Sequence, residues 1–435
     1  MQAASAEKAP RTAGSTARKL ALAGLVAVAT TVMLAAWINS AIHSIFLAWD
    51  FPVFYIAARM PLGHLYDPAA FAAFWQQQLQ PLGVVHWAPY VRPAVFAVLT
   101  RPLGLLPYRT AFLLWVVAGG CAYAACLLIL IRRFDLPAFS VPAFVGYFPF
   151  AAGLVSGQDN CVFLLAVIAG WLLLEAERDW LAGIVFGCCL YKYNLILLVP
   201  LLLVLKRRFR ALTSFVAVGA VLLAFSAALS SPRQYLDVLI NIRKLVPDFS
   251  PVGLRGATAM AGIPWSYPLL VIAVLVTCIW LMRHLPLCEA LCVAIVGMLL
   301  ISPYVTWYDS TLLLLPISLL ISRSDFTLRM LCILVLVLQQ LWRSDRGPIE
   351  ITPAIVGLVL LGYFFVLARR GRHKLIAGSS IATMTVSQSS PSLAGRLDSL
   401  WREPGVSSWL AQAVQEMEAR GHEWLGDRLQ EFRSK

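Results

Sequence analysis

A succession of uncharged apolar segments constrains this chain more than any other feature of its sequence. The first, Leu20–Ile42, is long enough to span a bilayer and too long for a signal-peptide core, so we expect an uncleaved anchor. Because 60% of the 435 residues are apolar and 13% are charged, the chain cannot cover its surface with polar groups. This excludes a water-soluble enzyme, a disordered protein and a coiled coil, and it predicts an all-α polytopic membrane protein. Further apolar segments lie near residues 111–131, 138–155, 160–176, 181–205, 211–230, 265–282, 286–303, 309–322, 327–342 and 352–368.

The basic residues set the expected topology, because loops rich in Lys and Arg face the cytoplasm. The polar, basic residues 1–19 predict a cytoplasmic N-terminal tail. We interpret 181–205 as two short helices with Lys192 at their outer tip, since a single crossing would place Lys206–Arg210 outside. This interpretation gives about 12 transmembrane helices with both ends cytoplasmic. It also gives a long first outer loop, His43–Arg109.

The predicted organisation is a transmembrane domain over residues 20–374 between two cytoplasmic tails. The C-terminal tail, residues 375–435, is Ser-rich at first and then amphipathic. Apolar side chains at helical spacing beside Arg and Glu predict a helix on the membrane surface or a partner site. A loosely ordered tail fits this segment equally well.

Motif patterns exclude several kinds of chemistry. The nine cysteines lie in apolar stretches and none forms CxxC, which argues against a zinc ribbon or a redox motif. The chain has no P-loop, HExxH or dinucleotide-binding glycine pattern, so an internal ATPase and a zinc protease are not expected. The sequence predicts no metal and no cofactor. A formal net charge of +13 suits anionic lipid headgroups or a phosphate substrate better than nucleic acid.

Asp50 is the residue that most strongly suggests chemistry. It follows the first apolar segment, between Trp49 and Phe51, at the expected outer boundary of the membrane. A carboxylate among aromatic side chains is partly desolvated, which raises its pKa and suits it to general-base catalysis. Taken alone, Asp50 also fits an ordinary polar residue at a helix end.

Several basic residues of the outer loops are candidates for binding a leaving phosphate, which needs cationic donors near the bilayer surface. These residues are Arg59, Arg92, Lys192 and Arg255. Lys192, at the tip of a short membrane hairpin, is costly unless an anion pairs with it. Each of these residues also has a simpler interpretation. Lys192 could snorkel to the headgroups, and Arg92 could be an ordinary interfacial arginine. For Arg255, an ordinary loop position is better supported than phosphate binding.

The outer turn Ser156–Asn160 offers a second set of candidates. Gln158 and Asn160 can hydrogen-bond a sugar hydroxyl, or they satisfy the backbone of the turn. Asp159 between them is a second carboxylate or a helix cap. His64, in the first outer loop, is a candidate phosphate contact, although a lone loop histidine more often has no such role.

Several short motifs follow one another in a recognisable order. They are Asp50–Arg59, Gly63–Pro68, Tyr90–Pro93, Arg101–Pro107, Trp115, Ser156–Asn160 and Ala182–Gly187, with Lys192 and a basic cluster after them. This order resembles the family 87 glycosyltransferases of the GT-C superfamily, over roughly residues 45–370. Known relatives include polyprenyl-phosphate-mannose-dependent mannosyltransferases.

The resemblance implies a GT-C-like bundle in a bacterial plasma membrane, with its active site facing the periplasm. Asp50 matches the place of the family's catalytic carboxylate, just after the first span. It would deprotonate an acceptor hydroxyl, which then displaces a lipid phosphate with inversion. The implied donor is a polyprenyl-phosphate hexose, with mannose expected, and the implied acceptor is a lipid-linked or envelope glycan.

One departure from the family pattern concerns the segment Ser302–Asp309. Family members often carry Trp followed by His after a Ser-Pro pair near the outer end of a late span. This chain has Trp307 followed by Tyr308, with Asp309 next. The resemblance makes Trp307 and Asp309 candidate substrate-binding residues, and the missing histidine leaves the type of donor open.

The alternative function is a polytopic transporter or a lipid or glycan flippase without covalent chemistry. Transporters tend to place ionisable residues at the bilayer midplane and to repeat one half of the chain in the other. Here the polar residues collect in outer loops, and the two halves show no similarity. The sequence therefore favours the glycosyltransferase, with membrane lipids, a sugar donor and a glycan acceptor as partners.

Overall fold

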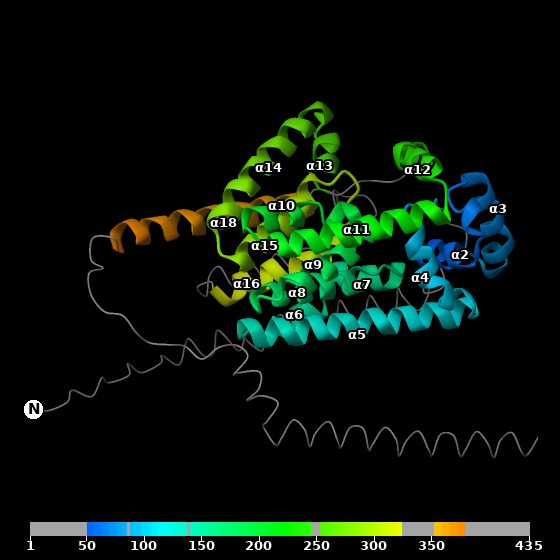
Figure 1. Ribbon diagram of the computed structural model, residues 1–435, viewed down its shortest axis with the longest axis horizontal. Helices are drawn as coiled ribbons and strands as arrows, with labels where there is room; N and C mark the ends of the chain where they lie inside the picture. Colours follow the sequence, from blue (N-terminus) through cyan, green and yellow to red (C-terminus); the bar gives the residue numbers. More distant parts are fainter. Residues whose placement is uncertain (1–49, 85–87, 137–139, 246–252, 324–351, 379–435) are drawn as a thin grey trace, which may run out of the picture. The chain divides into compact units, whose positions relative to one another are not determined.

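The computed structural model describes residues 50–84, 88–136, 140–245, 253–323 and 352–378, and every regular element in these ranges is a helix (Figure 1). The contacts divide the chain into two compact units, Met1–His373 and Lys374–Lys435. The pocket discussed below belongs to the first unit. The predicted anchor Leu20–Ile42, the predicted span at 327–342 and the amphipathic segment of the tail lie outside the described residues.

Short helices around the start of the described chain form a small hydrophobic core of their own. They are α2 (Phe51–Arg59), η1 (Leu62–His64), α3 (Pro68–Leu79), η2 (Gln80–Leu82) and α4 (Ala94–Gly104). Proline in the first turn starts both α2 and α3, where its missing amide costs no hydrogen bond. Asp67 caps α3 through the amides of Ala69 and Ala70. Helix α2 packs on α4 and buries every side chain except that of Arg59. This packing fixes Asp50, the residue just before α2.

Three helices of the described part are long and apolar enough to cross a membrane. They are α5 (Tyr108–Phe134), α11 (Phe209–Leu229) and the continuous segment Pro264–His284, which joins η5 (Pro264–Ser266) to α14 (Tyr267–His284). Their most apolar windows are between 11% and 28% buried, so these helices expose apolar faces of the kind that lipid covers. The sequence predicted about 12 spans; the described residues provide three, or four if one bent pair is a single span.

Breaks within the apolar segments account for much of this difference. Helices α6 (Val141–Val145) and α7 (Phe148–Ser156) precede α8 (Asn160–Glu175), and the chain turns by 117° between Ala143–Ser156 and Asn160–Glu175. Helices α9 (Asp179–Cys188) and α10 (Leu198–Leu205) are joined by η4 (Cys189–Leu195), which is broken at Lys192. Lys192 has φ −113° and ψ 58°, outside the helical region, so the predicted break at this residue is confirmed.

The main hydrophobic core surrounds α15 (Leu287–Ile301), whose residues from Cys288 to Leu300 are all buried. Helices α14 and α10 pack against it, and so do α16 (Leu314–Arg323) and η6 (Trp307–Leu313). The remaining helices are α12 (Pro232–Leu245), α13 (Leu254–Met260) and α18 (Thr352–Gly378). Helix α15 is apolar apart from Glu289 and is enclosed by protein; at 15 residues it is shorter than the three long apolar helices, so the span predicted at 286–303 stays a prediction.

The helices α5, α8, α9 and α11 lie side by side and run back and forth between two ends of this unit (Figure 1). One end carries the α7–α8 turn and α2. The other end carries the ion pairs Arg133–Glu175 and Arg208–Asp179, and exposed arginines including Arg178, Arg207 and Arg210. Exposed arginines also lie near α2, at Arg59, Arg101 and Arg109, so within the described residues the two ends differ in the buried polar pocket rather than in basic charge alone.

Candidate active site

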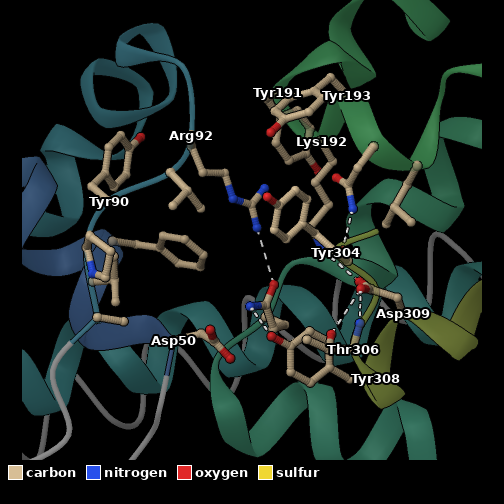
Figure 2. Close-up of a pocket in the computed structure, with 18 of the residues that line it drawn as sticks. Asp50, Tyr90, Arg92, Tyr191, Lys192, Tyr193, Tyr304, Thr306, Tyr308 and Asp309 are labelled. Carbon is tan, nitrogen blue, oxygen red and sulfur yellow. Dashed lines mark hydrogen bonds and ion pairs between the residues drawn. The ribbon is translucent and has the colours of Figure 1, made fainter. Parts of the chain in front are cut away.

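A pocket of about 200 Å³ lies where α2, the α7–α8 turn, η4 and η6 meet (Figure 2). This volume is below the usual range of small-molecule pockets, and it suits one small polar group rather than an entire lipid. Its lining is rich in tyrosine and carries two basic and two acidic side chains. The residues are Asp50, Val53, Phe54, Ala88, Pro89, Tyr90, Val91, Arg92, Gln158, Tyr191, Lys192, Tyr193, Asn194, Leu195, Leu239, Tyr304, Thr306, Tyr308 and Asp309.

Asp50 is the N-cap residue of α2 and faces this pocket, half-buried. Its side chain caps no helix amide, so the carboxylate is directed to other partners. Desolvation raises the pKa of Asp50 from the usual 3.8 to about 6, although hydrogen bonds with Gln158 and Tyr308 and the charges of Lys192 and Arg92 oppose the rise. A carboxylate with a pKa near 6 is suited to accept a proton close to neutral pH.

The backbone of the α7–α8 turn holds Asp50 in place. The Asp50 amide donates to the Ser156 carbonyl at 2.9 Å, and the Trp115 indole donates to the Gly157 carbonyl at 2.8 Å. Gly157 has φ +75°, and a Cβ there would lie 2.2 Å from the Cβ of Phe51. Glycine is therefore required at 157 both for the turn and for the close approach of α2.

Arg92 is 6% exposed and is held on all sides. Its two terminal nitrogens donate to the two oxygens of Asp159 at 2.9 and 3.0 Å, and Nη2 also donates to Oε1 of Gln158 at 3.2 Å. The guanidinium lies over the aromatic rings of Phe54, Phe96 and Tyr191, at 4.8, 4.8 and 5.1 Å from their centroids. This geometry fixes the arginine firmly in one orientation.

Lys192 is the second buried cation of the pocket, 7% exposed. Its Nζ lies 3.0 Å from Oδ1 of Asp159 and 3.6 Å from Oδ1 of Asp309, and it donates to the side chain of Asn160. Asp309 accepts from the amide and the hydroxyl of Thr306, both at 2.9 Å, in a capping box at the start of η6. The contact between Lys192 and Asp309 is thus the loosest of the ion pairs around this lysine.

The charges of the pocket nearly balance. Arg92 and Lys192 face Asp159 and Asp309, which leaves Asp50 as the carboxylate that sets the net charge of the cluster. Ionised Asp50 makes the cluster negative by one charge, and protonated Asp50 makes it neutral. Among the described residues, no group of three or more His, Cys, Asp or Glu side chains is arranged to hold a metal ion.

Of the ten candidate site residues chosen from the sequence, five line this pocket: Asp50, Arg92, Gln158, Lys192 and Asp309. Asn160 lies behind them and contacts Lys192. The other four, Arg59, His64, Arg255 and Trp307, do not line the pocket.

Each of these four has another environment. Arg59 donates to the Tyr55 hydroxyl and the Gly104 carbonyl, and His64 is exposed in η1. Arg255 contacts the Pro303 carbonyl and the Tyr304 ring, and the ring of Trp307 packs on that of Tyr308.

Tyr308 is a pocket residue that the sequence gave no reason to select. Its hydroxyl accepts from Nε2 of Gln158 at 3.0 Å, and it lines the pocket together with Asp50. Desolvation and the neighbouring charge of Asp50 raise the pKa of Tyr308 well above 10, so the hydroxyl keeps its proton. The only available signal was its place after Trp307, where the family pattern has histidine.

Comparison with known proteins shows which family the region around this pocket resembles. Residues 90–303 match the model of glycosyltransferase family 87. These residues belong to that family. The matched region supplies Arg92, the α7–α8 turn and Lys192, while Tyr308 lies shortly after the matched range and Asp50 lies well before it.

Curated relatives of this chain include the alpha-(1->3)-arabinofuranosyltransferases of two strains of Mycobacterium tuberculosis, CDC 1551 / Oshkosh and ATCC 25618 / H37Rv. Each is 27% identical to this chain over 201 residues, which is 44% of this chain and 46% of the relative. The chain thus spans about half the length of these relatives. No solved structure matches it significantly.

Proposed function

We propose that this protein is a membrane glycosyltransferase that transfers a sugar from a polyprenyl-phosphate donor to a lipid-linked or envelope glycan, with Asp50 as general base. The observation that carries the proposal is the position of Asp50. It is a half-buried carboxylate with a raised pKa that faces a small pocket, and the region that matches family 87 supplies Arg92 and Lys192 to the same pocket. The family match supports glycosyl transfer over the transporter considered above.

The proposed reaction is a direct displacement. Asp50 takes the proton of an acceptor hydroxyl as its oxygen forms a bond to the anomeric carbon. The bond between that carbon and the phosphate oxygen breaks, and the lipid phosphate leaves with the electron pair. Attack opposite to the leaving group inverts the anomeric configuration. Holding the reacting groups of the two substrates next to each other at the pocket converts an encounter between two molecules into a local reaction.

Lys192 is the residue that we propose for the donor phosphate. An ammonium has three donors; those of Lys192 are directed at Asn160, Asp159 and, more loosely, Asp309. A phosphate oxygen in the pocket would compete with Asp309 for the third donor, because that contact is the longest at 3.6 Å. The leaving group would then meet a buried positive charge, which stabilises it as the bond breaks.

Two sugars are candidates for the donor. The sequence resemblance implied a hexose, with mannose expected, whereas the curated relatives are named as arabinofuranosyltransferases. Both a mannosyl and an arabinofuranosyl donor therefore belong in the assay. We further propose that the end of the helices that carries Arg178, Arg207 and Arg210 faces the cytoplasm, which places the pocket at the periplasmic side.

The test is sugar transfer by purified protein in liposomes. Wild type, Asp50→Asn and Asp135→Asn are each incubated with radiolabelled polyprenyl-phosphate mannose or arabinofuranose and with extracted envelope lipids and glycans. Asp135 is an exposed aspartate in a left-handed turn, where asparagine is tolerated, so it controls for the loss of a carboxylate. We expect Asp50→Asn to lower transfer by about 10²- to 10⁴-fold and Asp135→Asn to leave it unchanged. Equal transfer by wild type and Asp50→Asn would refute the proposal.

A further inference from the structure

A chain of side-chain hydrogen bonds runs from the buried Arg92 through Gln158 to Tyr308, which lies beside Asp50, and each bond has a defined direction. Nη2 of Arg92 donates to Oε1 of Gln158 at 3.2 Å, and Nε2 of Gln158 donates to the Tyr308 hydroxyl at 3.0 Å. Gln158 and Tyr308 line the same pocket as Asp50, and both lower the pKa of its carboxyl group. Figure 2 shows Arg92, Tyr308 and Asp50 around this pocket, on separate segments of the chain.

The first link fixes the orientation of the Gln158 amide. An arginine can only donate, so the atom of Gln158 that faces Arg92 must be the carbonyl oxygen. The amide nitrogen then faces the other way and donates to the Tyr308 hydroxyl. Arg92 itself cannot easily turn, since Asp159 binds both of its terminal nitrogens.

The second link determines where the proton of Tyr308 points. Because the hydroxyl oxygen accepts from Gln158, its own proton is free to be donated. The neighbouring Thr306 hydroxyl gives its proton to Asp309 at 2.9 Å, and an ionised carboxylate is a stronger acceptor than a hydroxyl. The proton of Tyr308 is therefore available to Asp50, the carboxylate beside it in the pocket.

We propose that Arg92, Gln158 and Tyr308 are positioning residues, which hold the Asp50 carboxylate in one rotamer with a free oxygen turned to the acceptor hydroxyl, rather than ligands of the donor. This inference rests on the proposed function of Asp50 as base. It assigns Arg92 a role different from the phosphate contact predicted from the sequence. A guanidinium that is 6% exposed, paired with Asp159 and covered by aromatic rings has little surface left to offer to a phosphate.

Removing one link should change the protonation of Asp50. A hydrogen bond to the ionised carboxylate lowers its pKa, so Tyr308→Phe should raise it, by about one unit for a bond to a charged group. The charged groups that face Asp50 from the surrounding elements, Arg92, Lys192, Asp159 and Asp309, stay in place in this variant. The matched control is Tyr267→Phe, which also loses one tyrosine hydrogen bond, to the Ile301 carbonyl, but lies outside the pocket.

The experiment measures kcat and the donor KM from pH 4.5 to 8.5 for wild type, Tyr308→Phe, Tyr267→Phe and Arg92→Lys. We expect Tyr308→Phe and Arg92→Lys to lower kcat by about 10- to 100-fold, with an unchanged donor KM and an acid limb moved to higher pH. Tyr267→Phe should keep the wild-type profile. A raised donor KM with an unmoved acid limb in Arg92→Lys would instead identify a phosphate ligand and overturn the inference.

A second readout does not depend on turnover. Infrared difference spectra between each protein and its Asp50→Asn counterpart isolate the carboxyl band of Asp50, whose intensity against pH gives its pKa. A higher Asp50 pKa in Tyr308→Phe than in wild type supports the positioning role, and identical values overturn it.

If Asp50→Asn abolishes transfer while Tyr308→Phe behaves as wild type, the positioning role is wrong and the general base stands. If Asp50→Asn retains transfer, the proposed function itself fails.

Discussion

Arg92 and Asp159 form a buried two-point ion pair between residues that are 67 positions apart in the chain. The pair joins the loop before α4 to the turn between α7 and α8, and Lys192 adds a third segment to it. Because each partner is less than a tenth exposed, neither charge can be satisfied by water if the other is removed. The ion pair is therefore a structural requirement of the pocket.

Asp159→Asn is expected to destabilise the protein strongly. The change leaves Arg92 without its counter-ion and Lys192 with the looser partner Asp309, at a cost of about 3–5 kcal/mol. The measurement is the melting temperature in detergent, by intrinsic fluorescence. The control is Asp179→Asn, which removes a partly exposed pair with Arg208 and should cost under about 1 kcal/mol. Equal melting temperatures for the two variants would contradict this account of the pair.

The pH dependence of transfer should report the ionisation of Asp50. A general base acts when ionised, and the pKa of Asp50 is raised to about 6. We expect kcat/KM to rise about tenfold per unit below pH 6 and to level off above it, with steady-state kinetics in liposomes as the measurement. A profile that is flat between pH 4.5 and pH 7 would show that no such group controls the reaction.

Asp50→Asn is expected to stabilise the protein while it abolishes transfer. A carboxyl whose pKa is raised by folding favours the folded state below its unfolded pKa, near 3.8, and this contribution is lost as pH rises through about 6. At pH 8 the ionised Asp50 therefore costs on the order of 2 kcal/mol, which asparagine avoids. Melting temperatures at pH 8 and pH 4.5 test this, since the advantage of the variant should shrink at the lower pH. A less stable variant at pH 8 would mean that the carboxylate is well solvated.

Gly157→Ala should disturb the site through the backbone. The added methyl would lie 2.2 Å from the Cβ of Phe51, and φ of +75° is strained for alanine. We expect a loss of about 2–4 kcal/mol in stability and a fall in transfer, because Asp50 precedes Phe51. The control is Gly120→Ala on α5, where no atom lies within 4 Å of the new methyl and alanine favours the helix. A similar response to both substitutions would remove the special role of the turn.

The sequence predicted the helices well, and three of the predicted membrane crossings are long apolar helices among the described residues. Hydropathy located α5, α11 and α14, because a long apolar segment flanked by charges is a strong local signal. It could not distinguish a lipid-facing helix from α15, which is enclosed by other helices, since both are almost entirely apolar. The break at Lys192 was predictable because the charge pattern required a reversal there.

The sequence predicted several residues of the site, but not the contacts between them. Asp50, Gln158 and Lys192 stood out as polar residues in apolar surroundings, and they line one pocket. Arg59 had the same local appearance, yet its guanidinium turns back to the Gly104 carbonyl. The contact of Tyr308 with Gln158 joins residues 150 positions apart, and no local pattern encodes such a pairing.

The tether between Asp50 and Ser156 runs from main chain to main chain. Every amino acid carries a carbonyl, so the identity of residue 156 is irrelevant to the tether, provided that the replacement is small enough for this buried position. Homologous enzymes can therefore substitute alanine or cysteine for Ser156 and still hold the acid at the same point. The neighbouring glycine has no such freedom.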